Sequence, residues 1–295
     1  MPPIIAIKVD VDTYIGTREG VPMLLEILDR FGIHATFYFS MGPDNSGKAI
    51  RRIFRKGFLK KMLRTRAPSI YGGRTLLYGT ILPPPMIASS FPETLKKTEQ
   101  MGHEVGIHCW DHVKWHDLLP WMPKKTVAME LGRACALFED ILGHRTKTTA
   151  APGWTVSADS LEIQDAMFLS YCSDSRGHSP FFPVFDGRRF NTLQIPTTLP
   201  TMDELLGENG ITSETINDHY LSLIRPGLNV HTIHAELEGR VMAPVFIDLL
   251  QRLQKQGASF ITLAEAAAET GKHASDFPLA MGEIAGRAGL VATQG

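Results

Sequence analysis

The sequence predicts an α/β fold built on parallel strands, and three observations carry this prediction. Helical apolar patterns alternate along the chain with short β-rich runs, which is typical of parallel strands joined by crossover helices. About seven such strands occur in 295 residues, a length that favours a closed or nearly closed barrel over two domains. The most conspicuous polar residues directly follow the strands, where parallel barrels carry their functional side chains.

The predicted elements share one boundary signal. Four helical patterns end at Gly32, Gly102, Gly143 and Gly257, and glycine suits the left-handed backbone just past a helix end. A β-rich run follows each of these glycines within a few residues. Three further apolar runs complete the set, and the predicted strands are residues 4–9, 33–40, 103–108, 145–152, 168–173, 228–234 and 258–263.

Two segments depart from this pattern. We expect one domain over residues 1–269, interrupted at 45–92 by a segment that is too long for an ordinary loop and holds ten Lys or Arg without Asp or Glu. Apolar residues spaced three and four apart within 48–66 predict basic amphipathic helices lying in a membrane interface. Helices packed on the barrel with a solvated basic face are the alternative. Residues 270–295 are rich in Gly and Ala, and we expect a flexible tail there.

The composition excludes several classes of protein. The chain is 43% hydrophobic and 21% charged, as in soluble globular proteins. Its three cysteines are an odd number at no regular spacing, which favours a reduced, intracellular protein. No signal peptide or membrane-spanning run is predicted. Nucleic acid is not an expected partner, because the basic segment is interleaved with aliphatic more than aromatic residues and the rest of the chain is acidic.

Two histidines and an aspartate at strand ends form a candidate metal site. His108 ends the run 103–108, His112 lies four positions further on, and Asp12 follows the run 4–9. Two imidazoles and one carboxylate supply the three protein ligands of a catalytic zinc site that keeps a position open for water. The same ligands also admit Co²⁺, Mn²⁺ or Ni²⁺. Hydrogen-bonded histidines at the start of a loop are the alternative interpretation.

Two further residues are candidates for proton transfer. Asp10 lies two positions before Asp12, so an extended strand points both side chains to the same side, and Asp10 can accept a proton from a water that the cation activates. A capping role at the strand end is the alternative for either aspartate. His234 ends the run 228–234, where it can protonate a leaving nitrogen. We interpret His231 and Cys109 as packing residues.

These motifs resemble the polysaccharide-deacetylase superfamily of NodB-type metal-dependent hydrolases. The resemblance rests on VDVDT at 9–13, HCWDH at 108–112, APGW at 151–154 and TIHAELEG at 232–239. Longer matches, GTREGVP at 16–22, MGPDN at 41–45 and SDSRG at 173–177, resemble a subgroup of deformylases that act on a formamido sugar, and the similarity extends over about residues 4–268. The resemblance implies a distorted (β/α)7 barrel, a divalent metal with zinc preferred, Asp12, His108 and His112 as its ligands, Asp10 as general base and His234 as general acid.

Two departures from the superfamily pattern affect these roles. The usual adjacent aspartates are separated here by Val11, so the roles of Asp10 and Asp12 could be exchanged. The usual arginine before the proline of the third motif is absent, and Ala150 and Ala151 stand there. Another group must therefore orient Asp10. Our candidate is Arg176 together with Asp174, and Trp154 is a further candidate for contact with the substrate.

The resemblance implies removal of the N-formyl group from 4-deoxy-4-formamido-L-arabinose linked to undecaprenyl phosphate, a step in lipid A modification and polymyxin resistance. Such an enzyme would lie peripherally on the cytoplasmic face of the inner membrane. Candidate contacts with anionic lipid or the lipid phosphate are Arg51, Arg52, Arg55, Lys60, Lys61 and Arg64. One alternative is an N-deacetylase of another amino sugar. Another is a non-catalytic, metal-dependent membrane-binding protein, which would need neither Asp10 nor His234.

Overall fold

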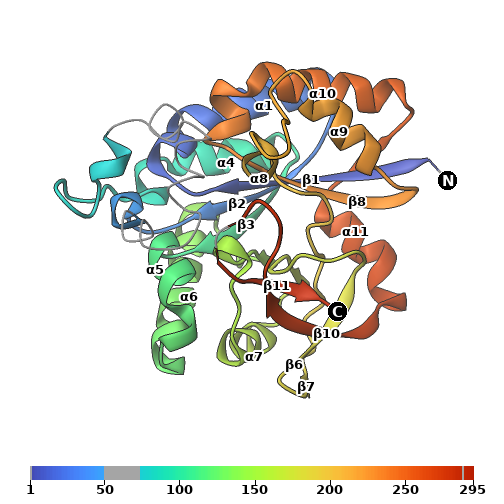
Figure 1. Ribbon diagram of the computed structural model, residues 1–295. Coiled ribbons are helices and arrows are strands. Elements are labelled where there is room, and N and C mark those ends of the chain that lie inside the picture. The colour runs from blue at the N-terminus through green and yellow to red at the C-terminus, as the bar shows by residue number, and fades with distance from the viewer. Residues whose placement is uncertain (1, 50–73, 288) are drawn as a thin grey trace.

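A parallel sheet with flanking helices forms the body of the protein in a computed structural model that describes residues 2–49, 74–287 and 289–295 (Figure 1). The sheet has the order β5-β4-β3-β2-β1-β8, and β9 pairs with the beginning of β1. Every pairing within it is parallel. Its strands are β1 (Pro3–Val11), β2 (Thr36–Ser40), β3 (Glu104–Cys109), β4 (Thr148–Thr149), β5 (Tyr171–Cys172), β8 (Gly227–His234) and β9 (Ser259–Ile261).

The predicted seven strands and the distorted barrel are confirmed. An irregular segment spans the side between β5 and β8, since Ile195 N donates to Cys172 O at 2.8 Å and Leu199 N donates to Val230 O at 3.1 Å. Hydrogen bonds therefore continue around the sheet without regular strand pairing on that side. Gly32, Gly102, Gly143 and Gly257 all have positive φ, as expected for glycines that follow helix ends.

Helices cover the outer face of the sheet. Figure 1 shows α1, α9 and α10 along one side of it. The described α-helices are α1 (Val21–Phe31), α4 (Pro92–Gln100), α5 (His112–Leu118), α6 (Lys124–Leu142), α7 (Ala158–Ala166), α8 (Met202–Leu205), α9 (Ile216–Leu223), α10 (Ala243–Lys255) and α11 (Leu263–Thr270). None of the described helices combines the length and the hydropathy of a membrane span.

Alternation along β1 separates the packing residues from the polar ones. Ile5, Ile7 and Val9 belong to the large core under the helices, whereas Ala6 belongs to a second core with Tyr38 and Val230. Successive side chains of a strand point to opposite faces, so Lys8 and Asp10 share the inner face with Ala6. The barrel interior therefore carries charged side chains near the carboxyl end of β1.

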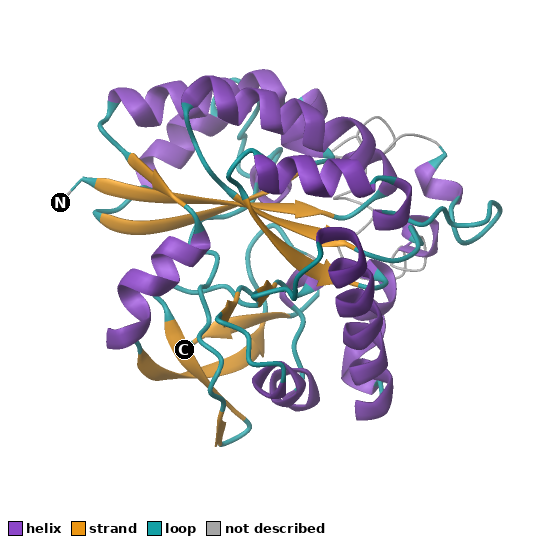
Figure 2. Cartoon of the chain, turned by 180° about the vertical axis from the view of Figure 1, so that it is seen from behind, coloured by secondary structure: helices purple, strands orange, loops and turns teal. Residues whose placement is uncertain are grey.

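The expectation of a flexible tail over residues 270–295 is wrong. β10 (Ser275–Gly282) pairs in parallel with β6 (Phe181–Phe185) and antiparallel with β11 (Val291–Gln294), and β7 (Arg188–Arg189) completes this second sheet. Figure 1 and Figure 2 show this smaller sheet on the side of the main sheet opposite α1, α9 and α10. Leu279 and Ala292 are buried in one core with Phe181. Because the partner strand is distant in sequence, local composition did not reveal this pairing.

The predicted membrane segment falls largely outside the described residues. Residues 50–73 are not described, and they include all six basic candidates for lipid contact, Arg51, Arg52, Arg55, Lys60, Lys61 and Arg64. The described part of the segment contributes to the fold, because Asp44 N donates to Pro85 O at 2.9 Å. The helical prediction for 48–66 stays a prediction.

Candidate metal and catalytic site

The structure brings Asp12, His108 and His112 together at the carboxyl ends of β1 and β3. One possible ligand atom from each lies within 4.8 Å of the others. Nε2 of His108 is 3.2 Å from Oδ1 of Asp12, and Nε2 of His112 is 3.4 Å from Oδ2. We call these three residues the metal triad. Asp12, rather than Asp10, therefore lies against both imidazoles, which favours the unexchanged roles.

The hydrogen bonds around the metal triad fit a bound cation. Nδ1 of His108 lies 2.7 Å from the carbonyl oxygen of Ala150, which can only accept, so Nδ1 carries the proton. The lone pair on Nε2 of a neutral His108 then faces the carboxylate of Asp12, whose buried Oδ1 makes no hydrogen bond. Two facing acceptors repel each other, and a shared cation relieves this repulsion.

Side chains from neighbouring loops hold the metal triad in place. Asp111 caps α5, which begins at His112, by accepting a hydrogen bond from Lys114 N at 3.0 Å. Asn45 Nδ2 donates to the second oxygen of Asp111 at 2.7 Å. Behind Asp12, Oε1 of Glu236 accepts from the backbone nitrogen of Asp12 at 3.0 Å. The MGPDN and TIHAELEG motifs therefore position the residues of the metal triad.

The electrostatics favour an ionised Asp12. Burial raises the pKa of Asp12, but the charge of His112 and the contact with His108 outweigh it and hold the pKa well below its usual value. Burial and the charge of Asp12 raise the pKa of Glu236 to about 8. A protonated Glu236 at neutral pH limits the negative charge beside the metal triad.

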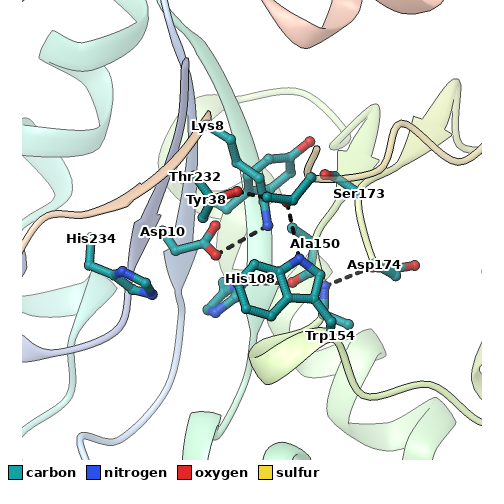
Figure 3. A network of polar contacts seen from close by, with 12 residues as sticks. Lys8, Asp10, Tyr38, His108, Ala150, Trp154, Ser173, Asp174, Thr232 and His234 are labelled. Atoms are coloured by element: carbon teal, nitrogen blue, oxygen red, sulfur yellow. Dashed lines mark hydrogen bonds and ion pairs between the residues drawn. The ribbon is translucent and has the colours of Figure 1, made fainter. Parts of the chain in front are cut away.

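Asp10 and His234 lie side by side next to the metal triad, because β1 and β8 pair with these two residues in register. Figure 3 shows both side chains together with Lys8. Burial lowers the pKa of His234, but nearby carboxylates, Asp203 first and then Asp12, raise it to about 9. His234 is therefore protonated at neutral pH and can donate a proton. Nδ1 of His234 is 4.0 Å from Oδ1 of Asp203.

Lys8, which our sequence analysis missed, is the residue that contacts Asp10. Its Nζ donates to Oδ2 of Asp10 at 3.1 Å, and the Lys8 side chain is fully buried (Figure 3). Oδ1 of Asp10 is buried without a hydrogen bond, so it is the oxygen that remains to accept a proton. The signal for Lys8 was present in the sequence, because it precedes Asp10 by two positions just as Asp10 precedes Asp12.

The prediction that Arg176 orients Asp10 is wrong. Nη1 of Arg176 donates to both carboxylate oxygens of Glu204, at 2.8 and 2.9 Å, and Nη2 donates to the carbonyl oxygen of Leu199. The guanidinium of Arg176 is thus engaged by Glu204, whereas Lys8 lies on the same strand as Asp10 and donates to it. Glu204 is a second residue that the sequence analysis did not single out.

Asp174 and Trp154 are both buried. Asp174 accepts a hydrogen bond from Ala151 N at 2.7 Å, next to the carbonyl oxygen that fixes His108. Trp154 is 2% exposed, and its Nε1 donates to Thr197 Oγ1 at 3.1 Å. Contact between Trp154 and a substrate therefore stays a prediction. His231 points to the opposite face of β8 from His234 and packs on Tyr220, with ring centroids 4.7 Å apart.

Comparison with known proteins agrees with this geometry. The family model for polysaccharide deacetylases matches residues 2–171, and the chain belongs to this family. A protein of Shewanella sediminis named "Probable 4-deoxy-4-formamido-L-arabinose-phosphoundecaprenol deformylase ArnD" is 40% identical over 262 residues, which are 88% of this chain and 85% of that protein. A protein of the same name from Wigglesworthia glossinidia brevipalpis is 33% identical over 95% of this chain and 98% of its own length.

A solved structure shows the same fold. The crystal structure of a Mycobacterium smegmatis protein assigned to the polysaccharide deacetylases superimposes with a TM-score of 0.64, at 16% identity, over 96% of this chain and 99% of that one. The family expected from the sequence motifs is thus confirmed. Since one fold can carry different activities, the reaction must be argued from the site.

Proposed function

We propose that this protein is a metal-dependent hydrolase that removes the N-formyl group from 4-deoxy-4-formamido-L-arabinose linked to undecaprenyl phosphate. The observation that carries the chemistry is that Asp10 and His234 lie beside the metal triad. Lys8 holds the carboxylate of Asp10, and the raised pKa of His234 favours a protonated imidazole. The formyl group, the sugar and the lipid carrier are supported by the names of the two relatives, each aligned over most of its length.

The residues divide the reaction into two proton transfers. A divalent cation bound by Asp12, His108 and His112 would supply Lewis acidity toward the formamide carbonyl and would activate water. Oδ1 of Asp10 accepts the proton of the attacking water, while Lys8 holds Oδ2. His234 donates its proton to the departing nitrogen, because an amine anion is a very poor leaving group. The products are formate and a cationic amino sugar.

The preferred metal is Zn²⁺, with Co²⁺, Mn²⁺ and Ni²⁺ as alternatives. Two imidazole nitrogens and one carboxylate oxygen suit each of these ions, and zinc is the commonest with three protein ligands and one open position. Metal analysis of purified protein, followed by chelation and reconstitution with single ions, tests this preference. Highest turnover with an ion other than Zn²⁺ would replace zinc in the proposal.

The test of the reaction compares formylated and acetylated versions of one undecaprenyl-linked sugar, with products identified by mass spectrometry. We expect the formyl compound to react and the acetyl compound to remain largely intact. Faster loss of the acetyl group would support the N-deacetylase alternative. Metal-loaded protein that turns over neither compound would support the non-catalytic alternative.

We further propose that the protein works peripherally on the cytoplasmic face of the membrane. The supporting features are the basic residues of 48–66 and three exposed apolar side chains, Ile81, Leu118 and Trp121, which are 78%, 48% and 76% exposed. Leu118 is the last residue of α5, whose first residue is the metal ligand His112. Exposed apolar side chains suit a substrate that carries a lipid, and basic residues suit anionic headgroups.

Replacing residues 48–66 with a short polar linker tests this location. Liposome flotation and turnover of the undecaprenyl substrate should both fall strongly, whereas hydrolysis of a water-soluble formamido sugar should be largely kept. High salt should weaken liposome binding of the unmodified protein. Flotation that is unchanged by the replacement would contradict a membrane role for the segment.

A further inference from the structure

Three cationic side chains surround the buried ring of Trp154. Arg287 Cζ lies 4.5 Å from the ring centroid, Arg176 Cζ lies 4.8 Å from it, and Lys8 Nζ lies 5.4 Å from it. Their carboxylate partners are Asp10, which binds Lys8, and Glu204, which contacts both arginines. We call these six residues the tryptophan cluster. It has three positive side chains against two negative ones.

Arg287 is the member of the tryptophan cluster with the weakest contact to a carboxylate. Its Nη1 is 3.4 Å from Oε1 of Glu204, whereas Arg176 binds both oxygens of Glu204 at 2.8 and 2.9 Å. Oε2 of Glu204 also accepts from Thr201 N at 3.0 Å. Within the described residues, the guanidinium of Arg287 makes no other hydrogen bond, although its side chain is only 12% exposed.

The fold places Arg287 close to the metal triad. Arg287 follows Gly286 in the connection between β10 and β11, and an added Cβ at Gly286 would overlap the carbonyl oxygen of Glu204. A Cβ at Gly153 would overlap the ring of His116 and lie 3.1 Å from Nη2 of Arg287. The ring of His116 stacks on that of His112, with centroids 6.3 Å apart. The ring of His116 thus neighbours both the Arg287 guanidinium and the candidate metal ligand His112.

A partly buried guanidinium with unused donors is costly unless an anion pairs with it. Its planar fork fits a phosphate, which it can bind through two parallel hydrogen bonds. A phosphodiester carries a single negative charge, which matches the surplus of one positive charge in the tryptophan cluster. In a sugar with a formamide on one carbon and a phosphodiester across the ring, the two groups lie one sugar ring apart.

We propose that Arg287 binds the phosphate of the lipid-linked sugar and so sets the preference for a phosphodiester substrate. This inference rests on the proposed function, since it takes the metal triad as the place where the formamide reacts. It also gives the C-terminal segment a role, because the pairing of β10 with β6 carries Arg287 to the site. The segment is then part of the substrate-binding surface.

The test uses two soluble substrates, the methyl phosphodiester and the methyl glycoside of the same formamido sugar, so that lipid and membrane play no part. Formate release is measured for the unmodified protein and for Arg287→Gln and Arg287→Lys. Calorimetry with the deformylated methyl phosphodiester gives a binding constant that does not depend on turnover, and inorganic phosphate is titrated separately. The matched control is Arg189→Gln, because Arg189 is exposed and pairs with Asp276 of β10 at 2.8 Å.

We expect Arg287→Gln to raise KM for the phosphodiester and weaken binding of its product by about 10- to 100-fold, the usual worth of a hydrogen bond to a charged group. Arg287→Lys should recover part of this loss. The methyl glycoside should react equally well with the unmodified protein and with Arg287→Gln. The Arg189→Gln control should resemble the unmodified protein on both substrates. The proposal would be overturned if the unmodified protein bound inorganic phosphate tightly but did not prefer the phosphodiester over the glycoside. It would also be overturned if Arg287→Gln lost turnover equally on both substrates.

Failure of the proposed function gives a different result. If the unmodified protein releases formate from neither substrate, the deformylase assignment is contradicted. The calorimetric comparison then still decides the role of Arg287. Product binding that does not change in Arg287→Gln would exclude the phosphate contact, whatever reaction the site performs.

Discussion

The metal triad and the tryptophan cluster lie on adjacent parts of one barrel mouth, but they differ in how their charges are balanced. The metal triad has one carboxylate between two imidazoles, an arrangement that a cation completes. The tryptophan cluster has three cations and two carboxylates, an arrangement that an anion completes. The opposite charge imbalances of the metal triad and the tryptophan cluster suit a substrate with a polarisable carbonyl at one end and a phosphate at the other.

Asp10 connects these two regions. Lys8 of the tryptophan cluster holds one of its oxygens, and the backbone register places it beside His234 near the metal triad. In the proposed reaction, proton transfer to Asp10 would therefore depend on a salt bridge that belongs to the other region. The following predictions test how far the two regions can be separated, from the largest expected effect to the smallest.

Removing a ligand should abolish the function of the metal triad. In His108→Ala, metal affinity and turnover should fall together by more than about 100-fold. Removing only a residue that supports a ligand already lowers metal affinity or activity by about 10- to 100-fold. Metal content and formate release measured on the same preparation check this. His144→Ala, which changes an exposed histidine paired with Glu99, is the control. Full activity in metal-free protein would contradict the metal role.

Asp10→Asn should separate proton transfer from metal binding. The metal should stay bound while turnover falls by roughly two to four orders of magnitude, the usual contribution of a positioned proton-transfer group. Metal analysis and single-turnover formate release measure the two effects. If Asp10→Asn loses the metal while Asp12→Asn keeps it, the roles of the two aspartates are exchanged.

Lys8→Met should leave the metal in place but weaken catalysis through Asp10. Loss of one partner of a buried salt bridge leaves an unpaired carboxylate, which should lower the free energy of unfolding by about 3–5 kcal/mol. The double variant Lys8→Met, Asp10→Asn should regain most of this stability. Urea denaturation of all three variants measures the coupling. Additive losses in the double variant would show that Lys8 does not act on Asp10.

The pH dependence should report His234. Its pKa in the folded protein, about 9, lies above the usual 6.5, so protonated His234 stabilises the metal-free fold. This stabilisation is complete below about 6.5 and is lost as the pH rises through about 9. Formate release by the metal-loaded protein should also decline at alkaline pH as the general acid deprotonates, but below this range, because the cation offsets the charge of Asp12 that raises the pKa of His234. A His234→Gln variant that keeps the same alkaline decline would assign it to another group.

Much of the metal triad was predictable because its signals are local. His108 and His112 lie at the end of one strand, and Asp10 and Asp12 lie at the end of another. The rule that parallel strands present their carboxyl ends together predicts that they meet. The same alternation pairs Lys8 with Asp10 and turns His231 away from His234. Lys8 was missed because the search was for a replacement of the arginine of the third motif. The two-residue period of a strand, applied to Asp10 and Asp12, also places Lys8 beside Asp10.

The tryptophan cluster was not predictable in this way, because its members come from separate parts of the chain. Lys8 lies on β1, Arg176 follows β5, Glu204 lies in α8, and Arg287 lies between β10 and β11. Their contacts depend on how β10 pairs with β6 and on the path of the irregular segment between β5 and β8. The composition of residues 270–295 even suggested a tail without structure.

The sequence by itself determined the alternation of strands and helices, the glycines that end the helices, and the candidate metal-binding and proton-transfer residues at the strand ends. These features follow from local backbone preferences and from the two-residue period of a strand. Only the tertiary structure decided which cation holds Asp10, which carboxylate Arg176 binds and where the C-terminal segment lies. The physical reason is that salt bridges and strand pairs between distant segments depend on packing, which no local pattern encodes.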